Sequence, residues 1–351
     1  METSGYYYSN PTLDYCLQYL ERTNRTVFFI SSNSCHNKNV INLCILPKIV
    51  FKINLFLIQI FGINLIGCYL KRLVKKKTPL LSELWIVDPD GLLLVPQVIL
   101  HNFECWYFSY ELWFQNEIGR KLAILMNKKI SNVDYIISTD AVRERLLVEE
   151  YSLGTKRKFC WPVFAPVETS NAELPKFESL KKALQNNKIL VFIGSIENWT
   201  MAPEIFDSLQ MLPENYRLLV NSRVKLNNIY KLIPQNVRDK VIINTTALNN
   251  FEEVMAFLKL ADIGLAFYKP TYSNRVLGKN IKVIGYSSGK ISTYLQAGLP
   301  VITNVSGEFR ADLSRFNSGV YVDAPANISI GIEEIANSEN IYKNGAKSHF
   351  E

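Results

Sequence analysis

The sequence predicts an α/β protein with two Rossmann-like domains. Short apolar strands alternate with helical stretches, and this alternation is typical of parallel sheets. The alternation breaks around Pro162, Pro166 and Pro175 and then starts again. With 351 residues, the chain is long enough for two domains of ordinary size. We therefore expect one domain over 1–165 and a second over 166–351, facing each other across a cleft.

The expected elements follow from runs of apolar residues and their spacing. In the first domain they are strands at 84–87, 98–101 and 133–138, and helices at 117–132 and 141–150. In the second they are strands at 189–193, 217–220, 241–243, 263–267 and 301–303, and helices at about 202–211, 226–234, 250–260 and 288–298. Near the start, Ser4 and Gly5 resemble the loop that normally follows a first strand, so we expect a clipped N-terminus.

Composition limits the kinds of partner that the protein is expected to bind. The net charge of +7 suits an anionic partner, such as a phosphate ligand or an acidic membrane face. No basic and aromatic motif of a nucleic-acid-binding protein is present, so we expect no nucleic-acid partner. The six cysteines show neither CxxC pairs nor metal-type spacing with the three histidines. Reduced cysteines in a cytoplasmic protein are the simplest interpretation.

The segment 45–77 is apolar in its middle and basic at its ends. Residues 53–70 carry no charge, Lys48 and Lys52 precede them, and five basic residues follow within 71–77. Three interpretations remain open: a buried helix of the domain, a helix lying in a membrane interface, and a true membrane span. Asn54 and other polar or glycine residues inside the run weaken the third.

The segment 287–302 is the most informative. Small polar residues and a glycine open a helix, Lys290 follows in its first turn, and Gly298 ends it before a short apolar strand. The free backbone N–H groups and the positive end of such a helix favour an anion, and Lys290 adds a full charge. An ordinary capped helix of an α/β unit is the alternative. Gly194 and Ser195, like Tyr268, directly follow predicted strands, where ligands bind in such sheets.

In this order and spacing, three pieces resemble family 4-like glycosyltransferases with the GT-B architecture. They are Val191–Ser195, Leu260–Tyr268 and the segment that ends at Pro300–Ile302. Residues 86–91, 110–112 and 134–138 look like pieces of the acceptor domain of related bacterial enzymes. The resemblance is specific over about 188–305 and loose before 165.

The resemblance implies a nucleotide-sugar donor in the second domain, an acceptor in the first, and no further cofactor or metal. Ser287, Ser288, Gly289 and Lys290 would hold the diphosphate, which becomes negative as the sugar leaves. The other donor-binding candidates follow strands or lie on the helix: Gly194, Ser195, Arg223, Lys225, Tyr268 and Thr293. Tyr268 has two interpretations, stacking on the nucleotide or packing at the edge of the cleft.

Two departures from the family pattern bear on activity. Many family members carry two glutamates separated by seven residues, and here Gly285 and Thr293 stand at those positions. Little chain remains after 340 for the family's returning C-terminal helix, so the C-terminus too is expected to be clipped. The alternative to an enzyme is therefore a catalytically degenerate, membrane-associated partner or scaffold.

For a catalytic base in the first domain, Glu111 and His101 are the candidates: Glu111 lies in a family-like Tyr-Glu-Leu, and His101 follows an expected strand. A retaining enzyme can dispense with such a base if the leaving phosphate assists the acceptor hydroxyl. Asp88 and Asp90 offer a rival, because two carboxylates at this spacing suit a divalent cation. A turn or a helix cap is the commoner use of such residues.

We therefore expect a metal-independent and retaining hexosyltransferase, acting from the cytoplasm at the inner face of the plasma membrane. Its acceptor would be lipid-linked or a polysaccharide, and the basic residues 71–77 would help it dock. A dinucleotide-dependent oxidoreductase is disfavoured, because no GxGxxG follows an expected strand.

Overall fold

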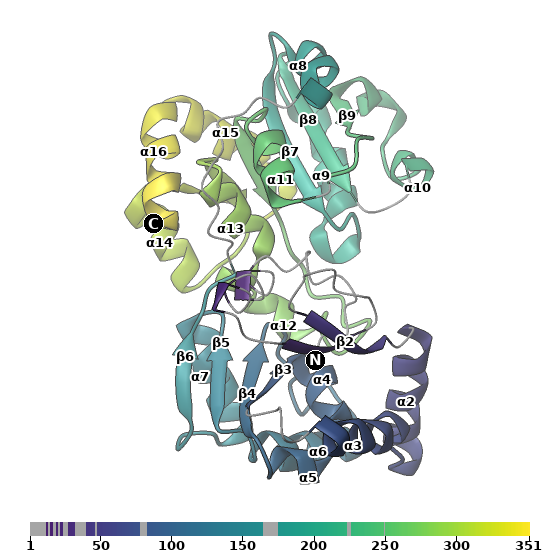
Figure 1. Cartoon of the computed structure of the whole chain (residues 1–351). Coiled ribbons are helices and arrows are strands. Elements are labelled where there is room, and N and C mark those ends of the chain that lie inside the picture. Colours follow the sequence, from purple (N-terminus) through teal and green to yellow (C-terminus); the bar gives the residue numbers. More distant parts are fainter. Residues whose placement is uncertain are drawn as a thin grey trace. The chain divides into compact units, whose positions relative to one another are not determined.

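The computed structural model describes residues 12, 15–16, 19, 22–23, 27–31, 40–45, 48–77, 83–163, 175–222, 226–248 and 250–351. The chain forms two compact units (Figure 1). The first comprises 1–165 together with 272–280, and the second comprises 166–271 and 281–351. The segment 272–280, which falls inside the range expected for the second domain, therefore packs with the first unit. We call it the strap.

The first unit contains a four-stranded parallel sheet in the order β3-β4-β5-β6. Its strands are β3 (Glu83–Val87), β4 (Glu104–Ser109), β5 (Tyr135–Ser138) and β6 (Arg157–Cys160). The helices between them are α4 (Asp88–Leu94), α5 (Gln97–Leu100), α6 (Arg120–Ile130) and α7 (Ala141–Tyr151). Two further strands, β1 (Val27–Ser31) and β2 (Val40–Ile45), pair with each other in parallel.

One expected strand is wrong. Residues 97–100 form the short helix α5, which begins directly after Pro96 and buries Ile99 and Leu100. A short apolar run next to a proline fits a buried helix as well as a strand, so its pattern does not separate the two. The strand of this region is β4, which begins at Glu104, after His101 rather than before it.

The apolar segment forms two helices, α2 (Lys48–Phe61) and α3 (Leu65–Lys77), which meet at a sharp corner. Within the described residues no single helix is long and apolar enough to cross a membrane. Among these residues, the pair Ile49–Phe61 and Leu65–Leu73 has the length and composition of a membrane span only when its two helices are taken together, and they are bent by 114°.

Polar residues inside the apolar run build this corner. Asn54 donates to Asn64 at 3.0 Å and accepts from the Ile66 amide at 3.0 Å. The Asn64 Oδ1 atom accepts from the Gly67 amide at 2.7 Å, and its Nδ2 atom donates to the carbonyls of Leu93 and Leu94. These amides satisfy backbone groups at the start of α3 and at the end of α4, so they hold the chain in a bend.

The second unit contains a six-stranded parallel sheet in the order β12-β11-β10-β7-β8-β9. Its strands are β7 (Lys188–Gly194), β8 (Tyr216–Ser222), β9 (Val241–Ile243), β10 (Ile263–Ala266), β11 (Val301–Thr303) and β12 (Gly319–Tyr321). Its helices are α8 (Glu178–Leu184), α9 (Ala202–Ser208), α10 (Leu226–Tyr230), α11 (Phe251–Leu258), α13 (Gly289–Gln296), α14 (Glu308–Phe316), α15 (Ile328–Ala336) and α16 (Glu339–Phe350). The short helix α12 (Lys279–Lys282) begins in the strap and ends in this unit. The strand order reverses between β7 and β10, and ligands bind beyond the carboxyl ends of strands at such a point.

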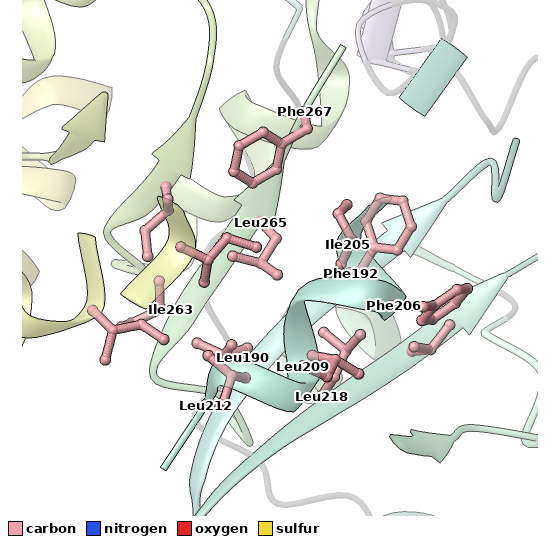
Figure 2. Packing of buried hydrophobic residues seen from close by; sticks show 14 of the residues in the cluster. Leu190, Phe192, Ile205, Phe206, Leu209, Leu212, Leu218, Ile263, Leu265 and Phe267 are labelled. Atoms are coloured by element: carbon pink, nitrogen blue, oxygen red, sulfur yellow. The ribbon is translucent and has the colours of Figure 1, made fainter. Parts of the chain in front are cut away.

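The core of this unit packs β7, β8 and β10 against α9 (Figure 2). Leu190 and Phe192 of β7 are fully buried. Ile205 and Phe206 of α9 and Leu265 of β10 are fully buried as well. All five strands expected in this half of the chain are confirmed, while β12 and the helices α14–α16 were not expected.

Tyr294 fixes α13 against the two central strands. Its hydroxyl accepts from the Ile193 amide at 3.0 Å and lies 3.2 and 3.3 Å from the carbonyl oxygens of Val191 and Leu265. A Cβ atom at Gly264 would lie 2.4 Å from the Tyr294 ring, so only glycine allows this approach. The start of α13 is thereby held near the carboxyl ends of β7 and β10.

Tyr294→Phe should lower the free energy of unfolding by about 1–3 kcal/mol, because the part-buried Ile193 amide loses the fully buried hydroxyl that it donates to. Urea unfolding followed by circular dichroism measures this. Tyr342→Phe is the control and should cost less, because it removes a hydroxyl that donates to the exposed Glu334 side chain at 2.6 Å and leaves no backbone amide without its acceptor. Equal losses in the two variants would contradict the pinning role of Tyr294.

Candidate functional site

The strand β7 ends in a turn that only glycine adopts easily. Gly194 has φ +94°, and a Cβ atom there would lie 3.8 Å from the Cε atom of Lys290. The carbonyl oxygen of the next residue, Ser195, accepts from the Thr200 hydroxyl at 3.0 Å. Gly194 therefore brings the backbone of β7 close to the Lys290 side chain.

Ser288 is the N-cap of α13. Its Oγ atom accepts from the Ile291 amide at 3.2 Å and lies 2.5 Å from the Tyr268 hydroxyl. The amides of Gly289 and Lys290 come earlier in the helix and have no helical carbonyl within reach. The Ser288 hydroxyl is thus occupied by the protein, and the N–H groups of the two residues that follow it are the ones without a carbonyl partner inside the helix.

Lys290 places an ammonium group under the start of α13. Its Nζ atom is buried and has no hydrogen-bond partner in the described part of the chain. It lies 4.0 Å from the centroid of the Phe192 ring and 5.6 Å from that of Tyr268. Burial lowers the pKa of Lys290 to about 7. A buried cation that meets only ring faces is costly, and an anion beside it would remove that cost.

Tyr268 is packed inside the second unit. It is buried, its hydroxyl meets Ser288, and its ring stacks on Trp199 with centroids 6.0 Å apart. Burial raises the pKa of its phenol. Trp199 is half-buried, and its Nε1 atom donates to Glu197 at 2.9 Å. Sequence reasoning missed Trp199, although an indole in the first loop after β7 is a signal that could have found it.

Thr293, which stands where the family has its second glutamate, points back into the helix. Its hydroxyl donates to the Gly289 carbonyl at 2.5 Å, and the residue is buried. Gly285, at the position of the first glutamate, adopts φ +36° in the turn Gly285–Ser287. Neither residue supplies a carboxylate. Arg223 and Lys225, the two basic candidates after β8, lie outside the described residues.

Glu111 belongs to a buried polar cluster of the first unit. One of its carboxylate oxygens accepts from the side-chain amide of Asn280, in the strap. The Oδ1 atom of Asn280 accepts from the Leu112 amide at 2.8 Å and from Arg143 at 2.7 Å. Arg143 is only 1% exposed and also donates to the Tyr110 carbonyl at 2.7 Å. Burial raises the pKa of Glu111, and the Arg143 charge opposes this.

The neighbouring Asp88 is used by the fold, whereas the Oδ1 atom of Asp90 is buried without a hydrogen-bond partner in the described part of the chain. The Oδ1 atom of Asp88 accepts from the amides of Tyr110 and Glu111 at 2.9 and 2.8 Å. Asp90 lies in the first turn of α4, and burial raises its pKa. Asp88 thereby ties the segment after β4 to the start of α4, and neither carboxylate caps this helix, whose N-cap Val87 has no side-chain cap bond. In the described part of the chain no group of three or more His, Cys, Asp or Glu side chains is arranged to hold a metal ion.

His101 is exposed at the end of α5, 3.4 Å from the Gln97 amide nitrogen. It precedes β4, so it lies toward the amino end of the parallel sheet, opposite the edge where ligands bind. His101 was a candidate base because it was expected to follow a strand, and the structure removes this reason.

No family model matches the sequence, and no curated protein is similar to it in sequence. Solved structures are similar in fold. WaaG, a glycosyltransferase of lipopolysaccharide biosynthesis, aligns with a TM-score of 0.68 at 12% identity, over 97% of this chain and 90% of WaaG. HepE of Anabaena, solved in complex with UDP, aligns with a TM-score of 0.63 at 11% identity, over 99% and 92%. A glycosyltransferase of Rickettsia africae gives 0.63 at 13% identity, over 99% and 91%.

The chain therefore has the fold of GT-B glycosyltransferases, as its three motifs led us to expect. The two parallel sheets are those of its two Rossmann-like domains.

Asn280→Ala should lower the free energy of unfolding by about 2–3 kcal/mol or more, because it strips partners from buried Arg143 and Glu111 and from the Leu112 amide. Urea unfolding measures the loss. Asn116→Ala is the control, since Asn116 is exposed and meets the strap only through Lys279 at 3.1 Å. If both variants unfold alike, the strap is not held by Asn280.

Proposed function

We propose that the protein is a glycosyltransferase that moves a sugar from a nucleotide-sugar donor to a lipid-linked or polysaccharide acceptor. The observation that carries this proposal is the Lys290 ammonium, buried without a hydrogen-bond partner at the start of α13. The fold supports it, and so do the ligands of similar structures: HepE holds UDP, and a structure named for trehalose-6-phosphate from E. coli holds UDP-2-fluoro glucose.

The chemistry of the proposed step needs positive charge where the leaving group forms. When the bond between sugar and diphosphate breaks, negative charge grows on the phosphate oxygens. The Gly289 and Lys290 amides, the positive end of α13 and the Lys290 ammonium would stabilise it. In this scheme the reaction uses no cofactor besides the donor. Retention of configuration follows from the family resemblance alone.

The proposed scheme uses no protein base. Glu111 shares its carboxylate with Asn280 and lies near Arg143, and this engagement suits a support for the strap better than proton transfer. An oxygen of the departing phosphate would then take the proton of the acceptor hydroxyl. Glu111 therefore contributes by holding the strap.

A catalytically weak scaffold is the second candidate function, and one observation favours it. Gly285 and Thr293 replace the two family glutamates, and the Thr293 hydroxyl is spent on the Gly289 carbonyl. The donor ribose and sugar would then lack partners that the family supplies. Loss of nucleoside diphosphate binding would favour this candidate.

Lys290→Met should weaken UDP binding by at least about tenfold at pH 7.5, and Lys290→Ala should slow sugar transfer by about a hundredfold. The reason is the loss of the charge that meets the diphosphate. Isothermal titration calorimetry with UDP measures the first effect. A panel of UDP-, GDP- and dTDP-sugars, compared by thermal shift, identifies the donor for the second. Undiminished UDP binding by Lys290→Met would refute the role of this residue.

In the same titrations, UDP affinity and proton uptake should depend on pH. The pKa of Lys290 is about 7 without an anion, and a bound diphosphate raises it. Between pH 7 and 8.5 the wild type should therefore take up a proton on binding UDP, and its affinity should fall as the pH rises. Lys290→Met should show neither effect. Titrations in buffers of different ionisation enthalpy count the protons, and no uptake by the wild type would contradict the proposal.

We also propose that the outer face of α2 and the corner after it rest on an anionic membrane. Ile49, Ile53, Phe56 and Ile60 recur at helical spacing on the face of α2 opposite the buried Phe51 and Ile58, and all four are exposed. Phe61, Ile63 and Leu65 continue the exposed apolar surface around the corner. So large an apolar surface is unusual in contact with water.

Charge fits the same partner. Lys71 and Arg72 of α3 are exposed, and no acidic residue lies between 41 and 82 in the sequence. An apolar helix face beside basic residues is typical of interfacial anchors on anionic lipid. Such a surface would place the enzyme at the inner face of the plasma membrane, beside a lipid-linked acceptor.

Ile53→Ser should weaken binding to vesicles of anionic phospholipid severalfold, because a large apolar side chain no longer enters the interface. Ile330→Ser is the matched control, since Ile330 of α15 is 58% exposed and Ile53 is 52% exposed. Reversing the charges of Lys71 and Arg72 should weaken binding further and remove its dependence on anionic lipid. Vesicle sedimentation measures both. If neither Ile53→Ser nor the charge reversals change vesicle binding, the membrane proposal is wrong.

A further inference from the structure

A chain of hydrogen bonds crosses the second unit next to the donor-binding candidates. His349, near the end of α16, places its Nδ1 atom 2.6 Å from the Ser318 hydroxyl and its Nε2 atom 2.8 Å from the Tyr286 hydroxyl. The Tyr286 hydroxyl donates to Asp312 at 2.5 Å, and the other oxygen of Asp312 accepts from Arg315 at 2.8 Å. These bonds join helix α16, the residue before β12 (Ser318), the turn Gly285–Ser287 and helix α14.

The chain has one self-consistent arrangement of protons. Because the Tyr286 hydroxyl donates to Asp312, it accepts from His349, so the imidazole carries its proton on Nε2. The Nδ1 atom is then the acceptor for the buried Ser318 hydroxyl. Each group in the chain has a partner when His349 is neutral. A proton on Nδ1 would take away the acceptor of Ser318.

Packing supports the neutral imidazole. Its ring stacks on Phe316 with centroids 4.6 Å apart and on Phe309 at 5.7 Å, and the Tyr286 ring meets it edge-on. Burial lowers the pKa of His349, and Arg315 acts in the same direction while Asp312 opposes them. The ring is thus held in one orientation by stacked aromatic rings and by a hydrogen bond at each nitrogen.

This arrangement reaches the proposed phosphate site through one short turn. Tyr286 is the middle residue of Gly285–Ser287, and the next residue, Ser288, caps α13. The Ser288 amide donates to the Gly285 carbonyl at 3.2 Å. The position of the Tyr286 side chain therefore helps to fix the turn from which the Gly289 and Lys290 amides start.

A serine paired with a histidine can also act as a nucleophile, but the geometry here excludes that use. Ser318 is fully buried, and a nucleophile must reach its substrate. The same burial suits a fixed support.

We propose that His349 is a positioning residue, which orients the phosphate-binding start of α13 by holding Tyr286 against Asp312. This inference rests on the proposed donor site. The turn Gly285–Ser287 takes side-chain support from α16 through the bond between His349 and Tyr286. His349 and Tyr286 touch no substrate in this scheme and act only through the backbone between Gly285 and Lys290.

Two histidine variants separate the bonds of the imidazole. In His349→Gln the side-chain amide nitrogen replaces Nε2 and can still donate to Tyr286, whereas in His349→Asn the amide replaces Nδ1 and reaches only Ser318. Tyr286→Phe removes the central hydroxyl. Tyr342→Phe is the control on the same helix, because it also deletes one phenol hydroxyl, bonded to Glu334, outside the chain of bonds. UDP affinity by calorimetry and the thermal unfolding midpoint are measured for all four and for the double variant His349→Asn/Tyr286→Phe.

Tyr286→Phe and His349→Asn should each weaken UDP binding about three- to tenfold, the effect of one lost hydrogen bond. The double variant should be no weaker than either, since both changes cut the same link. His349→Gln and Tyr342→Phe should bind UDP within twofold of the wild type at similar unfolding midpoints.

Wild-type affinity in Tyr286→Phe, or equal weakening in Tyr342→Phe, would overturn the positioning role, and Tyr286→Phe decides it even if His349→Asn fails to fold. Absence of binding of UDP, GDP and dTDP by the wild type would instead overturn the proposed donor site itself.

Discussion

The attachment of α13 to the sheet is the constraint on which the candidate site depends. Tyr294 reaches the ends of β7 and β10 only because Gly264 leaves room for its ring. With the helix fixed there, Ser288 caps it and Lys290 lies over the Phe192 ring. The anion binding that we propose therefore depends on packing in the core as much as on the residues at the start of α13.

The sequence was most informative where a pattern and a local signal agreed. The five strands of the second half were predictable because each is a short apolar run bounded by turn residues, and Gly298 and Pro300 marked the end of α13. The run 98–101 was ambiguous, since its length and composition fit a buried helix equally well, and Pro96 favoured the helix.

The candidate site was predictable in part. Gly194 and Lys290 were found because their residue types and places after strands have a direct physical use. The partners of Glu111 were not, because Asn280 lies far from it in the sequence and only the folded strap brings them together. The same holds for Trp199 against Tyr268 and for His349 against Tyr286. No periodicity records contacts between such distant residues.

The strap has a consequence for how this polypeptide matures. Asn280 completes the surroundings of Arg143, yet it is synthesised well over a hundred residues later. On the ribosome the first unit must therefore wait with a buried arginine incompletely paired until most of the second unit has emerged. A fragment that stops at the boundary near Ala165 would keep that deficit permanently. The two halves of this chain are consequently better regarded as a single biosynthetic unit than as modules that could be exchanged or produced separately.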